Sequence, residues 1–114
     1  MNLTQLSALL DARIVSKRGD PGLEIELAFA SDLLSDVLTV ESEKMLLITG
    51  LANPQTIRTA EMSDITCILF VRGKKATPEM KKLANENGIT LLECNSSMFR
   101  TAGILYGAGI KPVY

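Results

Sequence analysis

Two aspartates lie four residues apart in the apolar segment ASDLLSDVLTV, residues 30–40. On a helix, Asp32 and Asp36 would share one face. Together with Ser35 they could bind Mg²⁺, which needs only one or two protein carboxylates when substrate phosphates complete its coordination shell. The alternative is architectural, because Ser31 or Asp32 could cap the start of a helix and the helix dipole favours carboxylates in the first turn. No phosphate-binding loop follows the segment, so we favour helix capping.

A second group of candidate residues follows two continuous apolar runs, KMLLITG and ITCILFV. Each run fits a strand that is buried on both faces and leads into a helix N-terminus, where free backbone N–H groups favour an anion. In open parallel sheets, ligands bind beyond the carboxyl ends of the strands. We therefore expect any nucleotide or phosphorylated metabolite to bind at residues 49–55 and 71–78. The candidate ligand-binding residues are Thr49, Gly50, Asn53, Arg72, Gly73 and Lys74.

Neither loop matches a known phosphate-binding motif. TGLAN is not a Walker A loop, and VRGKKATP lacks the spacing GxxxxGK[ST]. Because charged loop residues are usually only exposed to solvent, a solvated basic loop is the favoured interpretation of Arg72, Lys74 and Lys75.

The composition excludes several classes of function. The 114 residues carry a net charge of −1 and contain no histidine, which excludes Ser-His-Asp and Cys-His catalysis and His-containing zinc sites within this chain. Cys67 and Cys94 belong to apolar runs and are interpreted as small buried hydrophobes. The absent basic excess and an aromatic content of 4% argue against nucleic acid as a partner. We expect no enzyme activity, no metal and no cofactor.

No signal peptide and no apolar run of about 18 residues is present, so we expect a cytoplasmic protein without a membrane partner. The length fits a single domain, residues 1–114.

The order of the predicted elements favours an α/β fold. The first half contains a helix, a short strand, a turn with Gly19, Pro21 and Gly22, a second strand, and the helix that includes Leu38. The second half alternates strands and helices, which is typical of a parallel sheet covered on both faces. Strands are predicted at residues 13–16, 25–30, 44–50, 65–71 and 89–94, and helices at 2–12, 30–40, 53–64, 77–88 and 95–107, followed by a tail at about 107–114.

The last predicted helix carries two features that could serve association. Gly103 and Gly107 stand four residues apart, a spacing that usually indicates close helix packing and here suggests a dimer. Asn95 or Ser96 is the predicted cap. The predicted inward stripe is Met98, Phe99, Ala102 and Leu105, and the tail residues that could bury surface against a second copy are Ile110, Val113 and Tyr114.

The segments ASDLLSDVLTV, KMLLITG and ITCILFVRGKKATPEMKKLANENGITLLECNSSMFRTAGILY together resemble the DRTGG-domain family, from the first helix to about Tyr106. SDLLSDV is similar to free-standing members. Other members lie beside CBS domains in regulated pyrophosphatases or are fused to phosphotransacetylase-like enzymes. The resemblance implies a three-layer α/β/α sandwich with a mostly parallel central sheet, like the N-terminal domains of HPr kinase/phosphorylase and of the Mur ligase that adds D-Ala-D-Ala.

The resemblance also implies a regulatory or assembly-forming domain, often at a dimer interface, without established catalysis of its own. The family's Asp-Arg pair is replaced here by Gly50-Leu51-Ala52-Asn53, and Val71-Arg72-Gly73 keeps only the final glycine of Thr-Gly-Gly. The chain therefore lacks the acidic and hydroxyl parts of those motifs.

We expect a non-catalytic regulatory or accessory domain that homodimerises and docks onto or regulates a partner enzyme. The alternative is a sensor that binds a nucleotide or phosphorylated metabolite at the strand ends. The weakest alternative is a Mg²⁺-dependent phosphoryl-transfer enzyme that uses Asp32 and Asp36.

Overall fold

The structure is a computed structural model that describes residues 1–16, 22–37 and 44–114. The predicted turn at Gly19 and Pro21 and the place of Leu38 in a helix lie outside the described residues.

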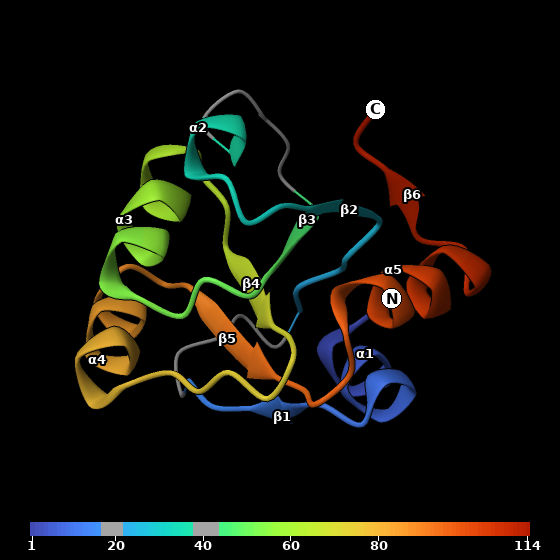
Figure 1. The fold of residues 1–114 in the computed structure, drawn as a ribbon, viewed down its shortest axis with the longest axis horizontal. Coiled ribbons are helices and arrows are strands. Elements are labelled where there is room, and N and C mark those ends of the chain that lie inside the picture. Colours follow the sequence, from blue (N-terminus) through green and yellow to red (C-terminus); the bar gives the residue numbers. More distant parts are fainter. Residues whose placement is uncertain (17–21, 38–43) are drawn as a thin grey trace.

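The described part of the chain forms one six-stranded sheet in the order β1-β5-β4-β3-β2-β6 (Figure 1). All neighbouring strands are parallel except β1, which pairs antiparallel with β5. The strands are β1 (Arg13–Ile14), β2 (Leu27–Ala30), β3 (Met45–Thr49), β4 (Cys67–Phe70), β5 (Thr90–Glu93) and β6 (Lys111–Pro112).

Helices cover both faces of this sheet. Figure 1 shows α1 and α5 on one side and α2, α3 and α4 on the other, which gives the three-layer α/β/α sandwich that the sequence predicts. The helices are α1 (Leu3–Leu10), α2 (Leu34–Val37), α3 (Pro54–Met62), α4 (Pro78–Glu86) and α5 (Met98–Gly107).

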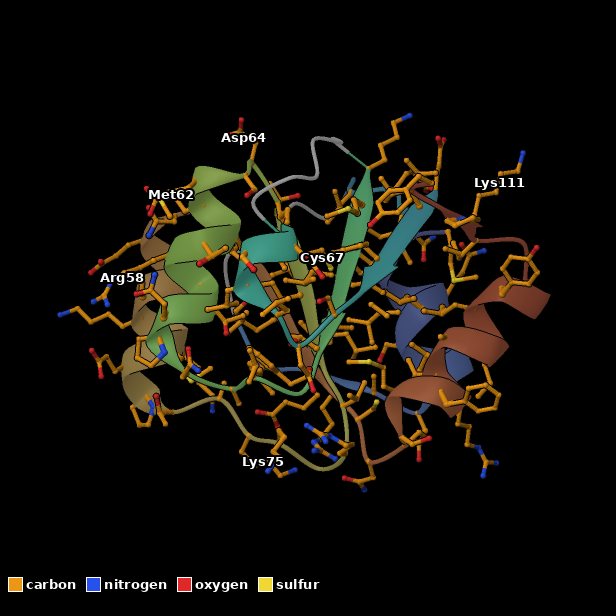
Figure 2. All side chains as sticks on the ribbon, turned by 45° about the horizontal axis from the view of Figure 1, so that its top comes forward. Arg58, Met62, Asp64, Cys67, Lys75 and Lys111 are labelled. Carbon is orange, nitrogen blue, oxygen red and sulfur yellow. The ribbon has the colours of Figure 1, made fainter. Side chains whose placement is uncertain are left out.

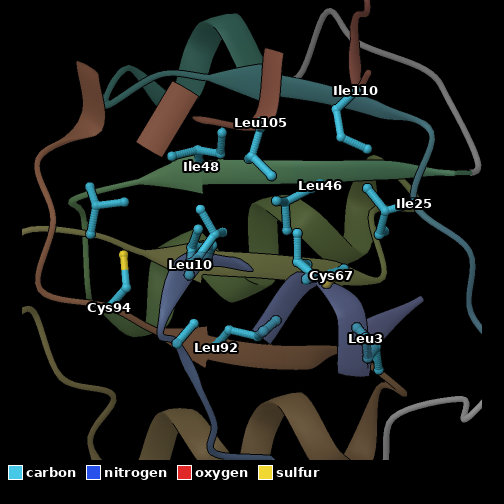
Figure 3. Packing of buried hydrophobic residues seen from close by; sticks show 14 residues of the cluster. Leu3, Leu10, Ile25, Leu46, Ile48, Cys67, Leu92, Cys94, Leu105 and Ile110 are labelled. Atoms are coloured by element: carbon cyan, nitrogen blue, oxygen red, sulfur yellow. The ribbon is translucent and has the colours of Figure 1, made fainter. Parts of the chain in front are cut away.

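The central strands alternate their apolar side chains between two cores. On β3, Leu46 and Ile48 belong to the core beneath α1 and α5, whereas Met45 and Leu47 belong to the core beneath α3 and α4. Figure 3 shows the first core, where Leu105 of α5 packs above the sheet. Because both faces of β3, β4 and β5 are buried, these strands are the continuous apolar runs seen in the sequence.

Three helices begin directly after a side-chain cap. Asn2 accepts a hydrogen bond from the Gln5 N–H, Asn53 from Thr56 and Thr77 from Met80. Proline occupies the first position of both α3 and α4, where its missing N–H costs nothing.

The cap of α5 differs from the prediction. Ser97, not Asn95 or Ser96, accepts the hydrogen bond from the Arg100 N–H. The carbonyls of Cys94 and Ser96 accept hydrogen bonds from Gly73 and Arg72. The chain before Ser97 is therefore bound to the neighbouring loop, and the helix begins after it.

Two further expectations about the C-terminal part are wrong. Residues after α5 were expected to form a tail, but Lys111–Pro112 form β6 and pair in parallel with β2. Proline is tolerated there because β6 is an edge strand. Phe99 was expected to point inward, but it is 90% exposed. Helix α5 instead packs on the sheet through Met98, Thr101, Ile104 and Leu105, which share the opposite face of the helix.

Burial raises the pKa of the Cys67 thiol to about 12 from its ordinary value of 9.0. Figure 2 shows this side chain in the interior. Because the folded pKa lies above the unfolded one, the stabilisation is fully present below pH 9 and is lost as the pH rises towards 12. From pH 8 to pH 10, the free energy of unfolding should fall by about 1 kcal/mol more in the native chain than in Cys67→Ala. Urea unfolding at both pH values measures this, and equal losses in the two proteins would contradict it.

Candidate functional site

The carboxyl ends of β2, β3 and β4 meet at one edge of the sheet, and Asp32 connects them. Its Oδ1 accepts hydrogen bonds from the Gly50 N–H at 2.7 Å and from the Thr49 hydroxyl at 3.1 Å. Its Oδ2 lies 3.4 Å from Nη2 of Arg72. These four residues, which come from three separate strand ends, form the central cluster of the candidate site.

Glycine at position 50 makes this arrangement possible. A Cβ at Gly50 would collide with the guanidinium of Arg72, which passes over the Gly50 backbone to reach Asp32. Any other residue at position 50 would therefore push the Arg72 side chain away from Asp32.

The loop after β4 has an unusual backbone at two consecutive residues. Arg72 and Gly73 have φ values of +61° and +73°, and the first of these costs about 1 kcal/mol in a residue that carries a Cβ. The conformation is held because the Arg72 N–H donates to Ser96 O at 2.8 Å and the Gly73 N–H to Cys94 O at 3.0 Å. The loop that carries Arg72 is thereby fixed to the connection between β5 and α5.

The structure corrects the interpretation of Asp32 as a helix cap. Helix α2 begins at Leu34, and the Ser31 hydroxyl accepts the hydrogen bond from the Leu33 N–H at 3.0 Å. Asp32 instead makes contacts with residues 18 and 40 positions away in the sequence. Within the described ranges, no group of three or more acidic or cysteine side chains is placed to bind a metal ion.

The six residues predicted to bind a ligand do not all share this cluster. Thr49, Gly50, Arg72 and Gly73 lie along the same edge. Asn53 Oδ1 caps α3 and accepts from both the N–H and the hydroxyl of Thr56. Lys74 is exposed at the end of the turn that contains Arg72 and Gly73, where its N–H donates to Val71 O.

Sequence comparison with the family motif implied that acidic and hydroxyl groups are missing at these strand ends. Asp32, from the end of β2, and Thr49 nevertheless place a carboxylate and a hydroxyl there. The motif comparison missed the Asp32 carboxylate because Asp32 follows β2, whereas the acidic residue of the motif would follow β3.

The sequence analysis also missed Glu93, a buried carboxylate at the end of β5. Its Oε2 accepts from the Ala76 N–H at 2.7 Å, and its Oε1 lies 3.5 Å from Arg13 Nη2 and 3.8 Å from Lys75 Nζ. An acidic residue that ends an apolar run, as in ITLLEC, was the available signal. Glu93 fixes the segment that enters α4, so Lys75 is an ion-pair partner and not only a solvated base.

The charges of this edge largely neutralise one another. Arg72 faces Asp32, and Lys75 faces Glu93, so the arrangement joins loops together. The Arg72–Asp32 pair is accessible, with 49% and 41% of the two side chains exposed, and such pairs contribute about 0–1 kcal/mol. An anion that binds Arg72 would therefore need to displace only the Asp32 carboxylate, which holds Arg72 weakly.

Asp32→Ala should lower the free energy of unfolding by about 1–3 kcal/mol, because the part-buried Gly50 N–H and Thr49 hydroxyl lose their acceptor. Asp32→Asn keeps an acceptor oxygen and removes only the charge, so it should cost less than half as much. Urea unfolding of the two variants tests this. Equal stability of Asp32→Ala and the native chain would show that the carboxylate does not hold the strand ends together.

No family model and no curated protein matches the sequence. Among solved structures, the chain is similar to the CBS and DRTGG domains of the regulatory region of Clostridium perfringens pyrophosphatase, in complex with the activator diadenosine tetraphosphate. The TM-score is 0.70 and the sequence identity 14%, and the match covers 91% of this chain. The chain spans 45% of the length of that structure.

No helix within the described ranges is long and apolar enough to span a membrane.

The similarity to the pyrophosphatase region establishes a shared fold and, at this level of identity, nothing more specific. The chain therefore has a fold related to that of a regulatory region that contains a DRTGG domain.

Proposed function

We propose that the chain is a non-catalytic regulatory or accessory domain that homodimerises and docks onto, or regulates, a partner enzyme. The observation that carries this proposal is a group of exposed aromatic side chains. Phe99, Tyr106 and Tyr114 are 90%, 73% and 86% exposed, the highest fractions among the large apolar residues that the structure describes. We call the surface formed by these three residues the α5–β6 face.

The α5–β6 face has the chemistry of a protein-binding surface. Tyr106 and Tyr114 line the same pocket, which joins α5 to the end of the chain after β6. Isolated exposed apolar residues are common, but grouped ones mark interaction sites, and aromatic residues are enriched at the centres of interfaces.

The residues at the carboxyl ends of the strands support the non-catalytic part of the proposal. Asp32 and Glu93 accept hydrogen bonds from, and form ion pairs with, neighbouring strands and loops, as expected of carboxylates that stabilise the fold. The pyrophosphatase region that shares the fold is itself described as regulatory, which supports an analogous role for this chain.

Light scattering coupled to size exclusion tests the homodimer. At concentrations up to about 100 µM, the range of a moderate-affinity dimer, the mass should approach twice the 12.4 kDa of one chain. The burial of apolar surface drives this association, so it should persist in high salt. A mass of one chain throughout this range would contradict the homodimer.

A second candidate function is supported by the accessible Arg72 side chain. We infer that a nucleotide or phosphorylated metabolite could replace Asp32 as the partner of Arg72, because a phosphate carries more charge than a carboxylate and guanidinium groups bind it through two hydrogen bonds. Lys74 is exposed in the same loop and would add positive charge. The pyrophosphatase region binds diadenosine tetraphosphate, a ligand of this class.

Thermal unfolding with ATP and with diadenosine tetraphosphate tests the sensor function. Ligand at about 100 times its dissociation constant should stabilise the chain by about 2.7 kcal/mol, which is seen as a higher melting temperature. Arg72→Asn should abolish the shift, because asparagine tolerates the left-handed backbone but lacks the guanidinium. Arg58→Ala on the exposed side of α3 is the matched control and should leave the shift unchanged. If neither nucleotide at about 1 mM stabilises the chain, the sensor function is excluded for these ligands.

A further inference from the structure

Helix α5 has an inner and an outer face with different chemistry. Thr101 and Leu105 are buried towards the sheet. Phe99, Gly103 and Tyr106 are exposed and, at spacings of four and three residues, share the outer face. Apart from the neighbouring residues and the backbone of α5 itself, no atom lies within 4 Å of a Cβ placed at Gly103 or at Gly107, so the helix surface is open to an approaching molecule there.

An apolar pocket of about 260 Å³ lies beside this outer face, between α5 and strands β2 and β6. The pocket is this large because Ala28 and Ala30 on β2 and Ala102 on α5 are too small to fill the space between α5 and the sheet. Tyr106 forms part of its wall. Because an apolar cavity of about 150 Å³ can hold a benzene molecule, this pocket is large enough for an aromatic side chain.

We propose that a second copy of this chain occupies the face, with the two α5 helices packed antiparallel about a two-fold axis at Gly103. This arrangement rests on the proposed homodimer and specifies its interface. In such a pair, a residue four positions before Gly103 faces the residue four positions after it in the partner. Phe99 of each copy then lies over Gly107 of the other and against Tyr106, where it covers the pocket.

Self-complementarity favours a second copy over an unrelated protein. The helix carries a protruding aromatic side chain, Phe99, four residues before Gly103. It carries a glycine, Gly107, which leaves space for such a side chain, four residues after Gly103. A two-fold interface requires this pairing of residue i with residue j on both copies. Glycine at the crossing point allows the two backbones to approach closely.

Charge and area are consistent with this occupant. Arg100 is the only charged residue of α5, so two such helices can pack without burying opposed like charges along their length. At about 200 Å² for each aromatic side chain, the exposed parts of Phe99, Tyr106 and Tyr114 amount to about 1,000 Å² for two copies. A standard stable interface buries about 1,600 Å² in total, so these side chains alone would supply more than half of it.

Oxidative cross-linking of Gly103→Cys tests the geometry. A two-fold axis at this position places the two introduced thiols within the reach of a disulfide, about 4.4–6.8 Å between Cα atoms. The native Cys67 and Cys94 are buried and should contribute little background. Arg58→Cys is the control, because it lies on the outer side of α3, on the opposite face of the sheet (Figure 2). Gly103→Cys should form a disulfide-linked dimer at low micromolar concentration, and Arg58→Cys should remain largely uncrosslinked.

Phe99→Ala gives an independent measurement. The dimer dissociation constant should rise at least 10-fold, as expected for an interface hot spot. Leu33→Ala, an exposed leucine outside the α5–β6 face, should leave it unchanged. If the native chain is dimeric but Gly103→Cys cross-links no better than Arg58→Cys, this interface is wrong and the proposed homodimer stands. If the native chain is a monomer, both are wrong.

Discussion

The burial of both faces of the central strands is the constraint on which the rest of the structure depends. Leu46 and Ile48 need a helical layer on one side of β3, and Met45 and Leu47 need another on the other side. The helices must therefore bury their apolar inner faces against the sheet. The strand ends and the outer faces of the helices remain available for interaction with other molecules. In this chain the strand ends are occupied by internal contacts, whereas α5 keeps an outer face rich in aromatic and glycine residues.

The strand ends show how acidic residues that suggest catalysis can serve the fold. Asp32 accepts hydrogen bonds from the Gly50 N–H and the Thr49 hydroxyl at the end of β3 and pairs with Arg72. Glu93 accepts a hydrogen bond from the Ala76 N–H before α4 and pairs with Lys75. Each carboxylate links parts of the chain that are distant in sequence. Their negative charge is balanced by Arg72 at Asp32 and by Arg13 and Lys75 at Glu93.

The sequence predicts well the features that depend on local chemistry. Asn53 before Pro54 and Thr77 before Pro78 identify two helix starts, and the runs around Leu47 and Leu69 identify buried strands, because each signal is complete within a few residues. Three features depend on distant contacts and were mispredicted or missed: the position of the Asp32 carboxylate, the two-residue strand β6, and the buried Glu93. Phe99 was predicted to point inward because it is apolar and directly follows Met98. Only the packed helix shows that Met98 points towards the sheet and Phe99 towards solvent.

We propose that the chain acts through the outer face of α5 and not through chemistry at its strand ends. Hydrogen exchange of the native chain, compared between dilute and concentrated samples, tests this claim residue by residue. Because association slows local opening of the segments that it buries, we predict that protection rises with concentration in Met98–Gly107 and at the pocket-lining strands β2 and β6. A rise confined to α3, α4 or the strand-end loops, or no dependence on concentration at all, would contradict the account.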